Sequence, residues 1–180
     1  MDYNLVEIIE AELNNYKKSF ALYDFTDMIE KFIGSELCPK FDVVFIDEAQ
    51  DLSPIQWKMY DIIKQNTKIM ILAGDDDQAI YGWAGADVQR FQEEPAKEKI
   101  LPKSYRVPIK VQQVADSIIS QIDTRIMKLW EPRNEEGHCE EVYDLDEVDL
   151  TQGKWLILAR TNYRLIKMKP YLMERGIYFE

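Results

Sequence analysis

Two short apolar runs stand out along the chain. Residues 43–46 form a β-branched and aromatic run that carboxylates follow at once, and residues 69–73 form a second run that ends at Gly74. Such runs are typical of strands buried on both faces of a parallel sheet. Between them, residues 53–64 have the apolar spacing of a helix, with Pro54 at a favourable first position. This β-helix-β alternation predicts an α/β fold with a parallel sheet.

Elsewhere, the spacing of apolar residues mostly predicts helices. These are expected at residues 4–19, from Asp24 or Thr26 onward, and at residues 87–92, 108–122 and 162–174. Further strands are expected at residues 99–101, 142–143 and 154–160, the last of them buried. Residues 123–137 are charged and contain Pro132, which predicts a solvated connection.

Composition narrows the possible functions. The chain has 180 residues, with 22 Lys and Arg against 33 Asp and Glu, a net charge of −11. A protein that binds nucleic acid on its own usually has a basic surface. Any binding of DNA by this acidic chain must therefore depend on base stacking or on parts that the chain lacks. Cys38, Cys139 and His138 do not form a zinc-binding pattern. Neither a signal peptide nor a membrane span is recognisable, which predicts a cytoplasmic protein.

Asp47 and Glu48 follow the first predicted strand directly. In open α/β sheets, ligands bind outside the carboxyl ends of the strands. An Asp at this place can hold the Mg²⁺ of a nucleoside triphosphate, and a neighbouring Glu can orient or deprotonate an attacking water. Alternatively, the two acids are simply the favoured residues at the N-terminus of a helix.

The second predicted strand leads into Gly74, three consecutive aspartates at residues 75–77, and Gln78. Three adjacent carboxylates repel one another unless cations or hydrogen-bond donors compensate. The Gln78 amide can accept from a water and donate to a phosphate oxygen, so it could sense a γ-phosphate. The alternative for Gln78 is a side chain that caps the turn.

Together and in this order, the segments Asp47-Glu48-Ala49-Gln50-Asp51, Gly74-Asp75-Asp76-Asp77-Gln78 and Tyr105-Arg106 resemble motifs II, III and IV of UvrD/Rep-like superfamily 1 DNA helicases. The resemblance spans about residues 22–179. It implies an α/β fold with the parallel sheets of two incomplete RecA-like P-loop NTPase motor domains. Residues 1–97 would be the back part of the first domain, and residues 98–180 the front part of the second.

The resemblance also implies a function and a set of site residues. The chain would be a segment of an ATP-dependent DNA helicase that uses ATP and Mg²⁺, with single-stranded DNA and the remainder of the helicase as partners. The implied catalytic residues are Asp47, Glu48, Gln78 and Arg106, with Asp47 at the metal. Nucleotide contacts are implied for Gln50, Gln78, Tyr105 and Arg106, and DNA contacts for Trp83 and Tyr81.

Chemistry supports these roles but leaves alternatives. A Tyr105 ring can stack on adenine, and the Arg106 fork suits a γ-phosphate, although it could equally pair with a surface carboxylate. An exposed Trp83 would be a platform for an unpaired base, although many Trp residues lie in the core. Tyr81 is expected to pack and position the same loop.

Some expected features are absent. Ala84 stands where the family often has an Arg after the Trp, so DNA binding is expected to be weaker. Ser104 stands where the family usually has an Asn before the Tyr-Arg pair. The seven glycines open no Gly-Lys-Ser/Thr phosphate loop, and we expect the isolated chain to be inactive. One alternative is a non-catalytic helicase-like module that binds nucleotide or DNA or has a regulatory role. Another is an unrelated acidic α/β protein.

Overall fold

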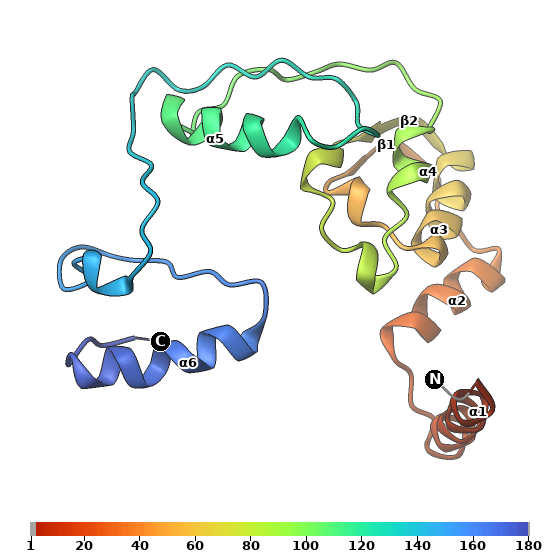
Figure 1. Cartoon of the computed structure of the whole chain (residues 1–180). Helices are drawn as coiled ribbons and strands as arrows, with labels where there is room; N and C mark the ends of the chain where they lie inside the picture. The colour runs from red at the N-terminus through yellow and green to blue at the C-terminus, as the bar shows by residue number, and fades with distance from the viewer. Residues whose placement is uncertain (1–2, 180) are drawn as a thin grey trace.

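The computed structural model describes residues 3–179 and shows one small sheet, with some helices beside it and others well separated from it (Figure 1). The helices are α1 (Tyr3–Phe20), α2 (Phe25–Ser35), α3 (Pro54–Gln65), α4 (Val88–Gln92), α5 (Ile109–Ile119) and α6 (Asn162–Glu174). The strands are β1 (Phe41–Ile46) and β2 (Thr67–Leu72). Short 3₁₀ turns are η1 (Ala49–Asp51), η2 (Asp76–Gln78), η3 (Gly82–Ala84) and η4 (Leu145–Glu147).

The two strands are parallel, and α3 connects them. Val43 pairs with Ile69, and Phe45 pairs with Ile71. Beyond the strands, the Ala73 amide donates to the Ile46 carbonyl at 2.8 Å, and the Ala49 amide donates to the Ala73 carbonyl at 3.0 Å. The β-helix-β prediction is therefore confirmed, and the carboxyl ends of both strands are tied to each other.

Helix α3 carries two of the four buried hydrophobic residues in the described part of the chain. Its start follows local rules: Pro54 occupies the first turn, and the Gln56 side chain accepts from the Ser53 amide at 2.9 Å. Trp57 and Tyr60 are almost fully buried on this helix, and their rings meet edge to face with centroids 5.1 Å apart. Such aromatic pairs add to the burial of apolar area, so α3 is anchored firmly.

An ionic cluster around Glu94 joins α3 to the end of α4. The Glu94 carboxylate is buried, accepts from the Tyr60 hydroxyl at 2.8 Å, and pairs with Lys64 and Arg90. Arg90 also pairs with Asp61 at 3.0 Å. Burial would raise the pKa of Glu94, but the hydrogen bonds from Lys64 and Tyr60 and the charge of Arg90 outweigh it, and the pKa is lowered. The carboxylate is thus held ionised between the two helices.

The predicted helices are confirmed, with small shifts at their ends. Asp24 caps α2 in a reciprocal pair with Asp27, each side chain accepting from the other's amide at 2.9 Å. Asp87 caps α4 by accepting from the Arg90 amide at 3.0 Å. Among residues 3–179, none of the helices is both long enough and apolar enough to cross a membrane.

The prediction that residues 43–46 are buried on both faces is wrong. Val43 is exposed, and Phe45 is 73% exposed. The described part of the chain has only two strands in the sheet, and two strands are too few to be covered as in a large parallel sheet. One face of β1, with Val43 and Phe45, therefore lies open, whereas the other face, with Val44 and Ile46, is half-buried.

The strands predicted in the second half are also wrong. Residues 98–179 form no strand, only an isolated bridge between Lys103 and Glu131. Trp155, Leu156 and Leu158 in the supposed buried strand are exposed. A strand needs a neighbouring strand for its backbone hydrogen bonds, and the described residues offer none at 99–101, 142–143 or 154–160. The structure thus has one parallel sheet where two were expected.

Residues 123–137 were expected to form a solvated connection, and this is confirmed only in part, because most of these residues are exposed but part of the segment is docked. The Ser104 amide donates to the Glu131 carbonyl and the Glu131 amide to the Pro102 carbonyl, both at 2.8 Å, so two extended segments run together (Figure 1). Where residues 123–137 come near the sheet, the side chains of Arg125 and Lys128 are only 12% and 11% exposed. This segment docks on the loop that follows β2.

Candidate functional site

Asp47 and Glu48 form the turn at the carboxyl end of β1. Glu48 has φ of 53°, a left-handed conformation that few residues other than glycine adopt. The Asp47 carboxylate accepts from the Glu48 amide at 3.0 Å, which supports this turn. Glu48 precedes η1, but its side chain makes no capping hydrogen bond there. Both carboxylates are exposed at the strand end rather than engaged as helix caps.

Gln50 bridges the ends of the two strands. It is 1% exposed; its amide nitrogen donates to Glu48 Oε2 at 2.8 Å, and its amide oxygen accepts from the Asp75 backbone at 3.0 Å. The backbone of Gly74 passes so close that an added Cβ would lie 2.6 Å from Gln50 Oε1. An alanine at this position would therefore force the Gln50 side chain or the Phe91 ring to shift.

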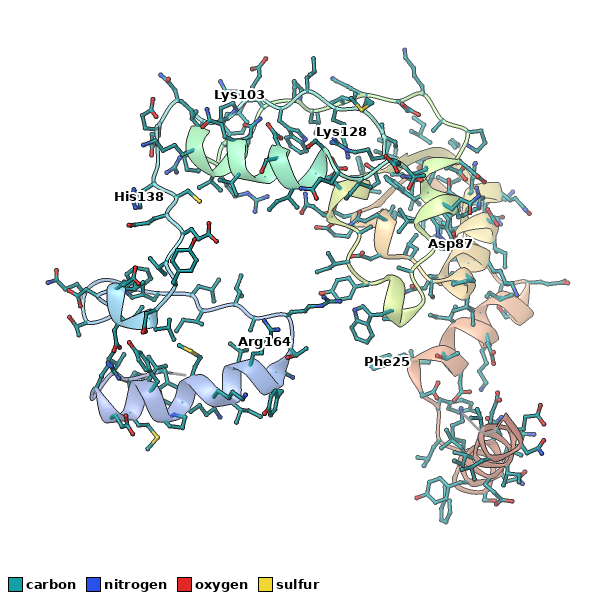
Figure 2. The ribbon with its side chains drawn as sticks, viewed as in Figure 1. Phe25, Asp87, Lys103, Lys128, His138 and Arg164 are labelled. Atoms are coloured by element: carbon teal, nitrogen blue, oxygen red, sulfur yellow. The ribbon has the colours of Figure 1, made fainter. Side chains whose placement is uncertain are left out.

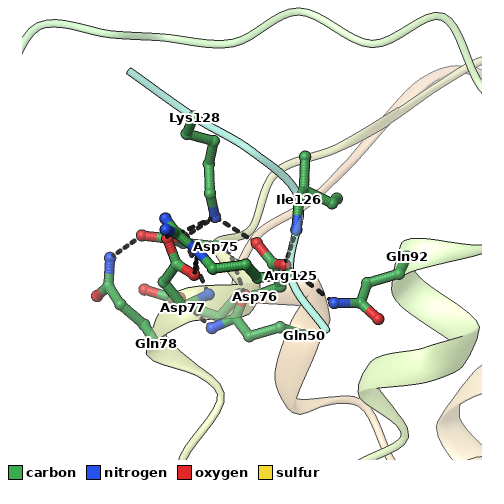
Figure 3. Close-up of polar contacts among 10 residues, drawn as sticks. Gln50, Asp75, Asp76, Asp77, Gln78, Gln92, Arg125, Ile126 and Lys128 are labelled. Carbon is green, nitrogen blue, oxygen red and sulfur yellow. Dashed lines mark hydrogen bonds and ion pairs between the residues drawn. The ribbon is translucent and has the colours of Figure 1, made fainter. Parts of the chain in front are cut away.

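The aspartates at residues 75–77 are compensated by two cations from the segment after α5 (Figure 3). Lys128 Nζ contacts all three carboxylates, at 2.5 Å for Asp75 and 3.2 Å for Asp77. Arg125 binds Asp77 through two parallel hydrogen bonds of 2.8 and 2.6 Å. The sequence predicted that this triad needs cations or donors, and the structure supplies them.

Further donors complete the environment of Asp76. Its Oδ2 accepts from the Ile126 backbone at 2.7 Å and from the Gln92 side chain at 2.9 Å. Burial would raise the pKa of Asp76, but hydrogen bonds from Lys128, Ile126 and Gln92 lower it overall. Burial would likewise lower the pKa of Lys128, but Asp75 and Asp76 raise it overall. Both groups thus remain charged near neutral pH.

Of the acidic groups at this edge, Asp47 suits a Mg²⁺ ion better than the triad does. Carboxylate oxygens of residues 75–77 approach within 4.8 Å of one another, close enough for a metal. Lys128 and Arg125 already offset two of their three negative charges. Asp47 instead offers an exposed carboxylate beside Glu48, the donor type that Mg²⁺ uses together with waters and phosphates.

Gln78 lies at the end of η2, on the exposed side of the triad. Its amide nitrogen donates to Asp75 Oδ2 at 2.6 Å. A continuous path of hydrogen bonds therefore runs from Glu48 through Gln50 and Asp75 to Gln78. The amide oxygen of Gln78 lies outside this path.

The loop around η3 presents an open aromatic surface. Trp83 is 84% exposed, and Tyr81 is half-exposed with its ring centroid 6.4 Å from that of Trp83. The alternative of a core position for Trp83 is thus wrong in this structure. An exposed indole braced by a second ring has the form of a stacking surface.

Tyr105 and Arg106 lie apart from this group, on the segment before α5. Tyr105 is exposed, with Lys103 Nζ 5.4 Å from its ring centroid, and Figure 2 shows Lys103 beside α5, away from Asp87. Within residues 3–179, no contact connects the Arg106 side chain to Glu48 or Gln78, and no carboxylate pairs with it. The structure brings together Asp47, Glu48, Gln50 and Gln78, but not Tyr105 and Arg106.

Arg125 and Lys128 were not predicted from the sequence as site residues. The only available signal was the unbalanced charge of residues 75–77, which required cations somewhere. With 22 basic residues in the chain and separations of about 50 positions, nothing in the spacing identified these two. Their role depends on the path of the chain after α5.

The fold and the site define an α/β protein with acidic and amide side chains gathered at the carboxyl edge of a parallel sheet. The family model described as the UvrD/REP helicase N-terminal domain matches residues 2–99, which is more than half of the chain. The chain belongs to the UvrD/REP helicase family.

Several curated relatives are similar in sequence. ATP-dependent DNA helicase Rep of Buchnera aphidicola is 30% identical over 206 residues, covering 92% of this chain and 31% of the relative. DNA helicase II of Haemophilus influenzae is 34% identical, covering 60% of this chain and 16% of the relative. DNA helicase II of Escherichia coli is 34% identical over 97 residues, covering 51% and 14%. The chain spans less than a third of the length of these relatives.

Proposed function

We propose that this chain is a segment of an ATP-dependent DNA helicase that couples hydrolysis of Mg-ATP to movement along single-stranded DNA. The observation that carries the proposal is the hydrogen-bonded path from Glu48 through Gln50 and Asp75 to Gln78. Such a path joins a candidate general base to a candidate phosphate sensor. Relatives described as ATP-dependent DNA helicases support the same function.

In this proposal, the strand-end residues divide the chemistry among them. Asp47 holds Mg²⁺, which neutralises charge on the phosphates of a bound nucleotide. Glu48 orients the attacking water and takes its proton. Gln78 uses its free amide oxygen toward that water, while its nitrogen stays on Asp75.

Tyr105 and Arg106 complete the nucleotide site from the other part of the chain. We place the boundary so that residues 1–97 belong to a first motor domain and residues 98–180 to a second. Tyr105 stacks on the adenine, and Arg106 offers its fork of donors to the γ-phosphate. Both side chains are exposed and thus free to meet a nucleotide when the two parts close on it.

Contact with DNA is assigned to the loop of Trp83 and Tyr81. Base stacking on an aromatic ring is worth about 1–3 kcal/mol per base and does not require a basic surface. This suits a chain whose net charge is −11, where phosphate contacts are few. Ala84 beside Trp83 offers neither a charge nor a hydrogen-bonding group from its side chain.

The DNA part of the proposal is tested by binding of the 180-residue chain to a fluorescent oligo-dT. Trp83→Ala should weaken binding about five- to a hundredfold, the equivalent of one stacked base. Trp155→Ala is the matched control, since that indole is also exposed but lies in the C-terminal part. Equal affinities for the Trp83→Ala protein and the unaltered chain would refute the role of this loop.

The catalytic part is tested by ATP hydrolysis with Mg²⁺, with and without single-stranded DNA. The 180 residues contain no Gly-Lys-Ser/Thr loop, so we expect a rate no higher than that of Glu48→Gln. DNA-stimulated hydrolysis that Glu48→Gln abolishes would show that the chain binds phosphates by another route. The same two tests can be made in a longer protein that contains a phosphate loop. If neither ATP nor Glu48→Gln changed its DNA binding, a non-catalytic module would be favoured instead.

A further inference from the structure

The contact between the segment after α5 and residues 75–77 is built from several independent interactions. Arg125 and Lys128 contribute side chains, and Ile126 between them contributes a backbone amide. Because these donors come from neighbouring residues of an extended stretch, they act on the acidic loop as a unit. We call this contact the cationic clamp.

The clamp is needed because the triad is nearly inaccessible to water. The side chains of Asp76 and Asp77 are 1% and 2% exposed, and that of Asp75 is 15% exposed. Buried carboxylates without partners would repel one another and lose their hydration. Removing a cation therefore leaves uncompensated charge, which forces the loop to move toward water.

Movement of the loop at residues 75–77 would displace the partners of both Glu48 and Gln78, the two ends of the hydrogen-bonded path. Asp75 uses Oδ1 for Lys128, Oδ2 for the Gln78 amide, and its backbone amide for Gln50. Gln50 in turn holds Glu48 Oε2 at 2.8 Å. Asp75 thus connects the clamp to Gln50 and Gln78 (Figure 3), and Gln50 extends this connection to Glu48.

We propose that Lys128 and Arg125 are positioning residues, which fix the Gln78 side chain and, through Asp75 and Gln50, the Glu48 carboxylate. The importance of this for hydrolysis rests on the function proposed above for Glu48 and Gln78. The positioning itself is a property of the free chain. It can therefore be measured without nucleotide or DNA.

The experiment uses the side-chain amide resonances of Gln50 and Gln78 in ¹⁵N-labelled 180-residue protein. Lys128→Met should shift both resonances and accelerate exchange of the Asp75 and Ile126 backbone amides about tenfold or more, because local opening exposes them. Lys128→Arg should leave the resonances and the exchange rates close to those of the unaltered chain, since it keeps the charge. Lys68→Met is the matched control, because Lys68 pairs with Asp42 on the open surface with both side chains about four-fifths exposed.

A second pair of variants separates positioning from general loss of structure. Arg125→Asp should disturb the same resonances, and Arg125→Lys should largely preserve them, because it keeps a cation beside Asp77. The Trp57 amide, bonded to Ser53 within the α3 turn, reports on global stability. Unshifted Gln50 and Gln78 resonances in Lys128→Met, or equal acceleration at Trp57, would overturn the proposal. Intact positioning with no response to Mg-ATP or DNA would count against the proposed function alone.

Discussion

At Gly74 the chain passes so close to Gln50 that a methyl group has no room. A Cβ there would lie 2.6 Å from Gln50 Oε1 and 2.9 Å from the Phe91 ring. We expect Gly74→Ala to lower the free energy of unfolding by about 1–3 kcal/mol, as overpacking does, and to break the Gln50 bridge. Urea denaturation measures this change.

The control for that substitution is Gly34→Ala. Gly34 lies in α2, and nothing comes within 4 Å of an added Cβ. Because alanine favours a helix over glycine, this variant should gain up to about 1 kcal/mol. If the two variants changed stability by the same amount, close packing at Gly74 would not be the reason for the glycine.

Glu94 makes stability depend on pH. Its folded pKa is lowered, so its ionic cluster stabilises the protein above the ordinary Glu pKa of about 4.3, and this contribution is lost as pH falls through the lower folded value. Glu94→Gln should cost about 1–3 kcal/mol at pH 7. Urea denaturation between pH 7 and pH 3 should show the gap between the two proteins shrinking below about pH 4. A gap that stays constant would contradict this account.

Residue-scale predictions succeeded where the chemistry is local. Asp47 and Glu48 lie at a strand end as their position after an apolar run indicated, and the charge of residues 75–77 is compensated. The identity of the compensating cations was unpredictable, because it depends on how a segment about 50 residues away folds back. Burial of Gln50 was missed for a similar reason: its partner Asp75 lies on the other strand's loop.

At the scale of elements, the helices were predictable, but of the strands only the two that α3 connects were. Helix ends are set by neighbouring residues, as with Asp24 at α2 and Pro54 at α3. A strand depends on a partner that can lie anywhere in the chain. Residues 154–160 have the apolar composition of a buried strand, yet among residues 3–179 no neighbour pairs with them.

The cap of α4 gives a test at this scale. Asp87 accepts from the Arg90 amide, and Arg90 supports the Glu94 cluster. Asp87→Ala should cost about 1 kcal/mol, whereas Asp87→Asn keeps the acceptor and should be nearly neutral. Thermal unfolding followed by circular dichroism measures both. Equal losses in the two variants would mean that the charge of Asp87, and not its cap, supports α4.

The whole molecule combines two opposing surface properties. Its net charge of −11 keeps chains apart, while open apolar side chains such as Phe45, Leu156 and Leu158 favour contact between them. The open strand edges of β1 and β2 add unpaired backbone groups that another chain could use. Which property prevails depends on how far the charges act through the solvent.

Salt therefore should control self-association of this chain. The screening length is about 10 Å at 0.1 M and about 3 Å at 1 M salt, so repulsion between chains weakens while apolar contact persists. We expect the mass from sedimentation to rise with salt, and Leu156→Glu together with Leu158→Glu to reduce that rise. Ile8→Glu controls for the added charge, since that side chain is also exposed but lies on α1. If salt instead dissociated the oligomers, ion pairs between chains would be holding them together, and the open apolar segment at residues 154–160 would not be the contact surface.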